Sequence, residues 1–183
     1  MLKQHISGKV YAFIDAQNLH LGVQALGWKL DWHKFRTYLT HKYHVDRAFL
    51  FIGFLPKNQH LYSALQQAGF ILIFKPVIVA RDGSVKGNVD AELVLHSMIE
   101  YPNYDHAVIV TSDGDFSCLV EYLAEKMKLL KIISPWYDTC SVLLRKAAKD
   151  RMAFLSDLKH KLVYVQKMGN RGGTHPHPQG PII

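Results

Sequence analysis

The chain has 183 residues, of which 49% are hydrophobic and 20% are charged. This composition indicates one globular domain with a substantial core rather than a disordered protein. No apolar run approaches the ~18 residues that cross a bilayer, and we expect no signal peptide, so a cytoplasmic protein without a membrane span is predicted. The cysteines Cys118 and Cys140 lack CxxC spacing and are expected to be reduced core residues.

The net charge of +7 is distributed unevenly along the chain. Residues 1–125 contain 11 basic and 12 acidic side chains, whereas residues 126–171 contain 11 basic and 3 acidic ones. Such an asymmetry favours a polyanionic partner, most commonly nucleic acid. A solvated surface that keeps the protein soluble would have the same composition, so the charge alone does not decide between the two.

The first half of the chain alternates between strand and helix patterns. The apolar run 10–14 predicts a strand that leads into Asp15, and a helix is expected from there to Leu26. Asp31 suits the N-cap of a second helix, whose apolar side chains recur at helical spacing. The same alternation then predicts a strand, a helix and a strand, at 48–52, 58–68 and 70–74, the last extended past Pro76 by 77–79.

The second half continues this alternation. A polar loop over 80–87 precedes a helix that Asn88 caps and that runs to about Glu100. Two strands are predicted next, at 107–112 and 129–133, each followed by a helix, at 116–127 and 141–149. A short apolar segment follows at 152–155. This regular pattern predicts a single α/β domain over residues 1–168, with a doubly wound, mostly parallel sheet and helices on both faces. Residues 169–183 have the composition of a disordered tail.

Two of the predicted strands deliver carboxylates to the same edge of the sheet. The first leads into Asp15, and the fourth leads into Asp113 and Asp115, which one glycine separates. Asp90 falls in the first turn of the helix that follows the polar loop, and that loop leaves the same edge. Taken singly, each acid has a common structural explanation as a turn residue, an N-cap or a partner of the helix dipole.

Together, the four acids indicate a cation site. Two like charges ~4 Å apart repel by about 4 kcal/mol at an effective dielectric of about 20. Clustered carboxylates therefore destabilise the folded state unless a counterion binds them. An all-oxygen set suits Mg²⁺ or Mn²⁺, whereas zinc would call for His or Cys ligands. Such ions activate water and neutralise charge that builds on a phosphoryl group.

Three segments resemble the motifs of the NYN (LabA-like) family, within the PIN-like nuclease superfamily. Residues 13–19 resemble the family's D-x-x-N strand end, residues 86–93 its K-G-x-D helix start, and residues 111–116 its S-x-D-x-D-F signature. The similarity covers residues 9–150, with the motifs in the family's order. It implies a PIN-like three-layer α/β/α fold with a five-stranded parallel core, and a Mg²⁺- or Mn²⁺-dependent ribonuclease site.

The resemblance also implies roles for individual residues. The catalytic acids and metal ligands would be Asp15, Asp90, Asp113 and Asp115. Asn18 would orient Asp15 or contact the substrate, and the hydroxyls of Thr111 and Ser112 would bind a phosphate or the metal's water. Lys86 would contact the scissile phosphate as a point charge, although an exposed loop lysine explains it nearly as well. The glycine between the last two acids is interpreted as a residue that permits a tight turn.

The leading hypothesis is a metal-dependent endoribonuclease that cleaves single-stranded RNA, with the basic C-terminal third as a phosphate track. Two alternatives stay open: a module that binds RNA or protein without cleavage, and a phosphatase-type hydrolase. A haloacid-dehalogenase-like phosphatase has a second Asp two residues after the first, but Gln17 stands at that position here. A nucleotide-binding P-loop enzyme is also disfavoured, because the sequence contains no G-x-x-x-x-G-K-[ST] loop. The RNA target, the choice between RNA and DNA, the native metal and the oligomeric state are left open, a homodimer being one possibility.

Overall fold

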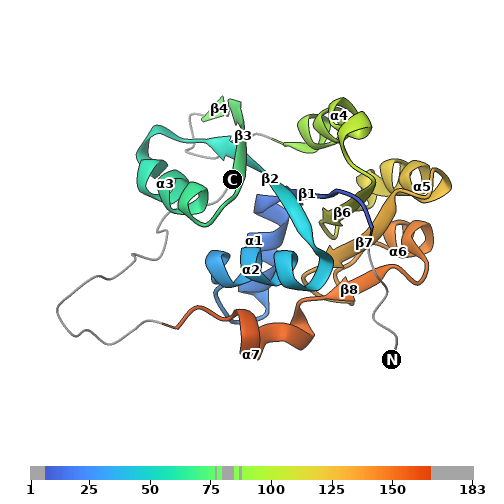
Figure 1. Ribbon diagram of the computed structural model, residues 1–183. Helices are drawn as coiled ribbons and strands as arrows, with labels where there is room; N and C mark the ends of the chain where they lie inside the picture. The colour runs from blue at the N-terminus through green and yellow to red at the C-terminus, as the bar shows by residue number, and fades with distance from the viewer. Residues whose placement is uncertain (1–6, 77, 80–84, 87, 166–183) are drawn as a thin grey trace.

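The fold is built on a six-stranded parallel sheet (Figure 1). The computed structural model describes residues 7–76, 78, 79, 85, 86 and 88–165. The strand order is β3-β2-β1-β6-β7-β8, and all neighbours in it are parallel. The strands are β1 (Val10–Asp15), β2 (Val45–Phe54), β3 (Ile71–Pro76), β6 (His106–Val110), β7 (Leu129–Ser134) and β8 (Met152–Phe154).

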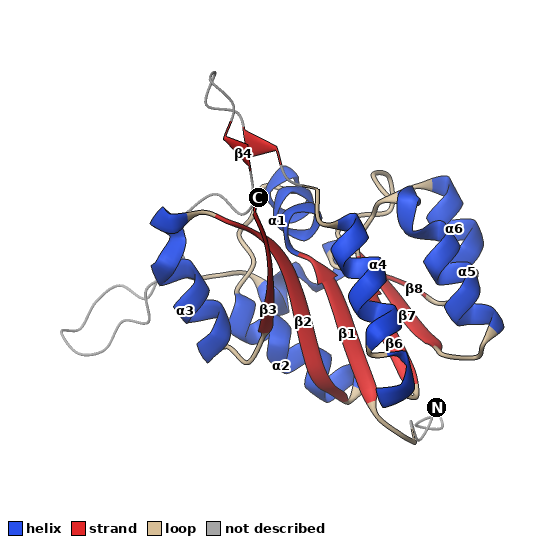
Figure 2. Ribbon diagram, turned by 90° about the horizontal axis from the view of Figure 1, so that it is seen from above, coloured by secondary structure: helices blue, strands red, loops and turns tan. Residues whose placement is uncertain are grey.

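Helices cover both faces of this sheet, which confirms the predicted three-layer α/β/α class. One layer contains α1 (Ala16–Ala25), α2 (Trp32–Tyr43), α3 (Gln59–Gln67) and α7 (Lys159–Leu162). The other contains α4 (Asp90–Ile99), α5 (Ser117–Glu125) and α6 (Val142–Ala148). Figure 2 shows α4 in front of the sheet and α1 and α2 behind it. Short 3-10 helices lie at η1 (Pro56–Asn58), η2 (Tyr101–Asn103), η3 (Gly114–Phe116) and η4 (Ser156–Leu158).

Burial on both faces explains the uninterrupted apolar runs. In β1, the side chains of Ala12 and Ile14 pack in the layer of α1 and α2, whereas those of Tyr11 and Phe13 pack in the layer of α4 and α5. All four are buried. Because successive side chains of a strand point to opposite faces, a strand covered on both sides needs an apolar residue at every position. In β1 this requirement ends at the carboxyl edge, where Asp15 follows.

The strand order reverses between β1 and β6. From β1 the chain moves outward through β2 and β3, then pairs β6 with the other side of β1 and continues outward to β7 and β8. Ligands of open parallel sheets bind at the carboxyl ends of the strands, at such a switch point. Asp15 ends β1, and the acidic turn follows β6, so the topology brings these acids to the expected crevice.

Two features of the sheet differ from expectation. It has six strands rather than five, because Met152–Phe154 pairs with β7. The described residues of the predicted extension, Ile78 and Val79, do not belong to β3: they form β4 (Ile78–Val79), which pairs antiparallel with β5 (Val85–Lys86) in a separate two-stranded sheet. The neighbour β2 ends where Phe54 pairs with Pro76, so β3 has no partner beyond that point. The rest of the expected 80–87 loop and the predicted disordered tail lie outside the described residues.

Cys118 is exposed, contrary to its predicted place in the core, whereas Cys140 is buried. Helix α5 turns Leu119, Val120 and Leu123 into the core, and this spacing leaves Cys118 on the solvent side. Both thiols are free. No helix among the described residues is long and apolar enough to cross a membrane.

Candidate metal centre and active site

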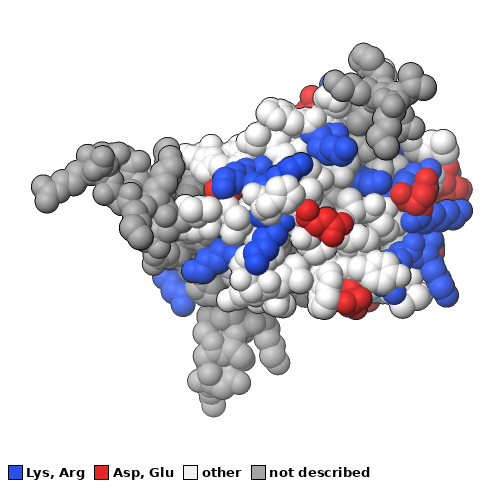
Figure 3. Space-filling view, turned by 90° about the horizontal axis from the view of Figure 1, so that it is seen from below, with Lys and Arg blue, Asp and Glu red and all other residues white. Residues whose placement is uncertain are grey.

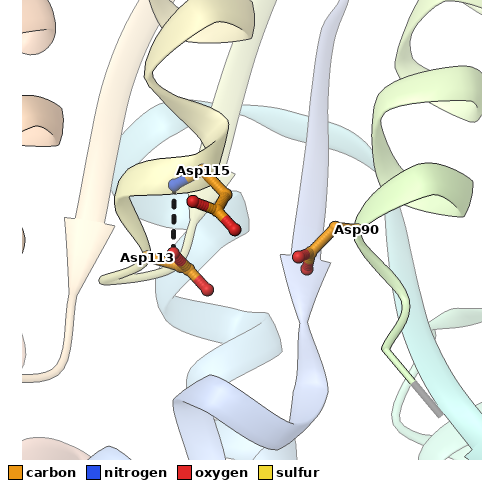
Figure 4. A group of neighbouring side chains, drawn as sticks. All are labelled: Asp90, Asp113 and Asp115. Atoms are coloured by element: carbon orange, nitrogen blue, oxygen red, sulfur yellow. Dashed lines mark hydrogen bonds between the residues drawn. The ribbon is translucent and has the colours of Figure 1, made fainter.

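Three of the four predicted acids come together at the carboxyl edge of the sheet. One carboxylate oxygen from each of Asp90, Asp113 and Asp115 lies within 4.8 Å of the other two. Asp90 is the first residue of α4, and the other two belong to the turn between β6 and α5. Figure 4 shows the Asp90 carboxylate facing this turn. Segments far apart in the sequence therefore contribute to one oxygen-rich group.

Asp15 lies beside this group without being part of it. The residue is 5% exposed, and its carboxylate caps α1 by accepting a hydrogen bond from the Asn18 N–H at 3.0 Å. Burial is the main cause that raises the pKa of Asp15 from 3.8 to about 6, and the negative charges of Asp90 and Asp113 act in the same direction. The Asn18 N–H opposes this rise. The fourth acid is thus electrostatically coupled to two of the other three.

Asp90 is held at the start of α4 by the side chain of Asn88. The Asn88 Oδ1 accepts from the Asp90 N–H at 2.9 Å, and its Nδ2 donates to the Asp90 carboxylate at 2.6 Å. The N-cap is Val89 rather than the predicted Asn88, and Asn88 supports the helix from the position before the cap. Burial raises the pKa of Asp90, Asn88 lowers it, and the charges of Asp113 and Asp115 raise it further.

The acidic group has little compensating positive charge. Among the residues that the structure describes, none of the four carboxylates forms an ion pair with Lys or Arg within 4.0 Å. Lys75 acts on Asp90 at longer range, while its Nζ pairs with Glu92 at 2.9 Å. Uncompensated, closely spaced carboxylates with an oxygen-only donor set fit a hard divalent cation. The residues present therefore suit Mg²⁺ or Mn²⁺.

Asp113 caps the turn that carries the acidic pair. Its Oδ1 accepts from the Asp115 N–H at 3.0 Å, as drawn in Figure 4, and η3 begins at the next residue. Asp113 rather than Asp115 is therefore the capping residue, because a 3-10 turn precedes α5. The side chain of Asp115, which is exposed, points to the same side as that of Asp113 (Figure 4).

Gly114, between these acids, is required by close packing rather than by turn conformation. It is not among the described glycines with positive φ. A Cβ at this position would lie 2.3 Å from the Oγ of Ser141 and 3.0 Å from its Cβ. Ser141 is the N-cap of α6, and its N–H donates to the Ser112 carbonyl at 3.0 Å. Gly114 lies in the tight turn, as expected, but the turn does not need glycine's conformational freedom there; glycine is needed because the α6 N-terminus packs directly on it.

Ser141 is a supporting residue that sequence reasoning missed. A serine before an apolar helix does signal an N-cap, but the predicted helix over 141–149 gave Ser141 no role at the site. Its contact with the acidic turn joins residues that are distant in sequence, so no local pattern reports it.

The polar residues around the acids bond mainly to the backbone of the site. The Asn18 Oδ1 accepts from the Ser112 N–H at 2.9 Å and from its hydroxyl at 2.8 Å. Thr111 is fully buried, and its Oγ1 accepts from the Asp113 N–H at 3.1 Å. Lys86 lies in β5, and its side chain is outside the described part of the structure. Substrate contacts by Asn18, Lys86, Thr111 and Ser112 stay predictions.

One known domain family matches most of this chain. The model of the NYN domain matches residues 9–155, a range that includes all four acids. The chain belongs to the NYN domain family. NYN domains are PIN-like nuclease domains, so the acidic group lies in the setting of a nuclease family.

Two relatives extend the similarity over most of this NYN chain. The low amplitude and bright protein LabA of Synechococcus elongatus is 26% identical, with 93% of each chain covered. A protein of unknown function from Vibrio parahaemolyticus, whose crystal structure is known, is 28% identical in sequence, and the two structures superpose with a TM-score of 0.69. That match covers 89% of this chain and 100% of the Vibrio chain. The chain is therefore a LabA-like NYN protein.

Proposed function

We propose that this NYN protein is a metal-dependent endoribonuclease that hydrolyses phosphodiester bonds of single-stranded RNA. One observation carries the proposal. In a chain that belongs to a nuclease family, carboxylate oxygens of Asp90, Asp113 and Asp115 lie within 4.8 Å of one another at the switch point of the sheet. Converging carboxylates of this kind are expensive unless a cation binds them.

We assign the three converging acids as metal ligands, with Asp15 as the fourth carboxylate. The coupling of Asp15 to Asp90 and Asp113 supports this assignment. Mg²⁺ or Mn²⁺ bound there would supply Lewis acidity, which activates water and offsets the charge that develops on the phosphoryl group. Because the pKa of Asp15 is raised to about 6, its carboxylate is charged at neutral pH and becomes protonated in mild acid, where cation affinity should fall.

The surrounding side chains hold the proposed metal ligands in position. Asn18 connects the end of β1 to Ser112 in the turn after β6, and Ser141, the N-cap of α6, supports the acidic turn. Ligands fixed by such secondary contacts need little rearrangement when the cation and the substrate bind. Lys86 is assigned, by its match to the family motif alone, as a contact to the scissile phosphate.

A cleavage assay separates this function from RNA binding without catalysis. Purified protein is incubated with a 5′-labelled single-stranded RNA in Mn²⁺, in Mg²⁺ and in EDTA, beside a DNA oligonucleotide of the same sequence. Cleavage of RNA that requires metal supports the proposal. RNA that stays intact under all conditions but is retained by the protein supports the non-cleaving module instead.

A further inference from the structure

A hollow of about 340 Å³ lies beside α6, along the edge strand β8. Helix α6 and its C-cap contribute one face to it, with the spacing i, i+3, i+4 and i+7, at Val142, Arg145, Lys146 and Lys149. The opposite face of α6 is buried in the core. The hollow therefore lies on the solvent side of α6, in the layer that also contains α4 and α5 (Figure 2).

Two aromatic rings form part of its lining. Tyr137, in the loop after β7, and Phe154, the last residue of β8, meet edge to face with centroids 5.4 Å apart. The Arg145 Nη1 donates to the Tyr137 carbonyl at 2.8 Å, and its guanidinium lies 4.3 Å from the Tyr137 ring centroid. Tyr137 is 54% exposed, so it offers ring surface to a ligand while Arg145 fixes its position.

Within the described part of the chain, the cations of the hollow have no acidic partners. Arg145, Lys146 and Lys149 form no ion pair within 4.0 Å with any carboxylate that the structure describes, and no carboxylate lines the hollow. On the face seen from below, Figure 3 shows Lys and Arg in several groups with Asp and Glu between them. Aromatic surface beside uncompensated cations suits the base and the phosphates of a single-stranded nucleic acid.

The hollow is next to the acidic turn. Ser141, directly before α6, donates to the carbonyl of Ser112 and contacts Gly114 between the two acids. Phe154 pairs with Ser134 at the carboxyl end of β7, so this end of the hollow lies at the same edge of the sheet as the acids. A polynucleotide at the acids can therefore reach the hollow by passing the N-terminus of α6.

We propose that this hollow is a nucleotide-binding subsite for the RNA substrate, in which a base packs against Tyr137 and Phe154 while flanking phosphates contact Lys146 and Lys149. The proposal rests on the proposed function, because it assumes that the bound strand continues to the acids. The nucleotide in the hollow is distinct from the one that carries the scissile bond.

RNA binding in EDTA tests the subsite separately from cleavage. Fluorescence anisotropy of a short labelled single-stranded RNA is measured with wild type and with the double variant Lys146→Ala/Lys149→Ala. The variant is expected to bind about tenfold more weakly, and the slope of log K against log salt should fall by about 1.4, ~0.7 for each lost phosphate contact. The matched control is Lys29→Ala/Lys42→Ala, which removes the same charge from exposed residues in the other layer, outside the basic C-terminal third, and should bind within about twofold of wild type.

The aromatic part of the subsite has its own variant and its own probe. Tyr137→Leu keeps apolar bulk but removes the ring, and should weaken RNA binding about fivefold, with no effect on a labelled oligoglutamate used as a polyanion without bases. Because a variant can misfold, wild type is also irradiated with RNA that contains 5-iodouridine. Crosslinks mapped to Tyr137 or Phe154 support the subsite, and crosslinks confined to other segments overturn it.

The outcomes separate the subsite from catalysis. An equal loss of RNA affinity in the two double-lysine variants would indicate non-specific electrostatic attraction and would overturn the proposal. The proposal is also overturned if oligoglutamate binding depends on Lys146 and Lys149 as strongly as RNA binding does, because the hollow would then be an acidic-peptide site. A protein that never cleaves RNA, yet loses RNA binding in the α6 double alone, would contradict the proposed catalysis and support the subsite. Cleavage by wild type, with binding unchanged in the α6 variants, would contradict the subsite alone.

Discussion

The side chain of Asn18 accepts hydrogen bonds from both polar groups of Ser112, from the N–H at 2.9 Å and from the hydroxyl at 2.8 Å. The backbone N–H of Asn18 also donates to the Asp15 carboxylate at 3.0 Å. One residue at the start of α1 therefore connects the acid that ends β1 to the turn that carries Asp113. This connection crosses the switch point of the sheet, where the proposed cation binds.

Replacing Asn18 with Ala should weaken both the fold and the site. The change leaves the N–H and hydroxyl of Ser112 without this acceptor, and we expect the free energy of unfolding to fall by about 1–2 kcal/mol, with a loss of metal-dependent cleavage. Chemical denaturation and the RNA assay measure the two effects. Asn103→Ala removes an exposed amide that bonds to Glu100 and should stay within about 0.5 kcal/mol of wild type. If Asn18→Ala matches this control in stability and cleavage, the connection has no structural role.

Replacing Asp15 with Asn should raise stability in the absence of metal. The pKa of Asp15 is raised from 3.8 to about 6, mainly by burial, so between these values the folded state binds a proton that the unfolded state releases. Wild type in EDTA should therefore lose about 2–3 kcal/mol of unfolding free energy as the pH rises from about 4 to about 6. Asp15→Asn should remove most of this loss and be the more stable protein at pH 7.

Denaturation curves over this pH range, in EDTA, check the prediction. Asp157→Asn removes an exposed acid outside the site and should keep the wild-type pH dependence. An Asp15→Asn protein that loses as much stability with rising pH as wild type would show that Asp15 is not the group responsible.

Replacing Gly114 with Ala should destabilise the protein through one contact, and a second substitution should relieve it. The new Cβ would meet the Oγ of Ser141 at 2.3 Å, and overpacking of this kind costs about 1–3 kcal/mol. Ser141→Gly removes the obstructing atoms, while Gly at an N-cap costs only about a few tenths of a kcal/mol. In the double variant the cost of Ala should therefore largely disappear. Additive effects of the two substitutions on unfolding free energy would contradict this account.

Much of the fold could be predicted because strands covered on both faces must be apolar throughout. The runs that lead into Asp15 and Asp113 gave the positions of β1 and β6, and alternation with helices gave the parallel sheet. The place where β3 ends could not be predicted in this way. It depends on β2 ending opposite Pro76, which is a property of the neighbouring strand rather than of the local sequence.

The site was predictable in its acids and less so in its supporting contacts. Strand ends and the family motifs indicated all four acids, but they did not indicate that Asp15 lies outside the group within 4.8 Å. Nor could they separate a glycine needed for a turn from one needed for space, because Gly114 meets Ser141 only after α6 has packed against the acidic turn. Such contacts depend on tertiary packing, which local patterns do not encode.

Binding of Mn²⁺ or Mg²⁺ should stabilise the folded protein through the acidic group. At a metal concentration of about 100 times the Kd, the gain is about 2.7 kcal/mol, which raises the Tm of a chain of this length by about 5–10 °C. Asp90→Asn removes one carboxylate and should lose most of this increase. Glu121→Gln, an exposed residue of α5 outside the group, should keep it. Differential scanning fluorimetry with metal and with EDTA measures the shift, and an equal shift in both variants would place the cation elsewhere.

The most direct test of the central claim is cleavage of single-stranded RNA by wild type and by Asp113→Asn in Mn²⁺ and in EDTA. Asn keeps the shape of the side chain and an oxygen that can accept from the Asp115 N–H, as Asp113 does, so the variant should remain folded by circular dichroism. We predict that wild type cleaves only with metal and that the variant cleaves at least about a hundredfold more slowly. Cleavage by Asp113→Asn at the wild-type rate in Mn²⁺ would contradict an active site built on these carboxylates.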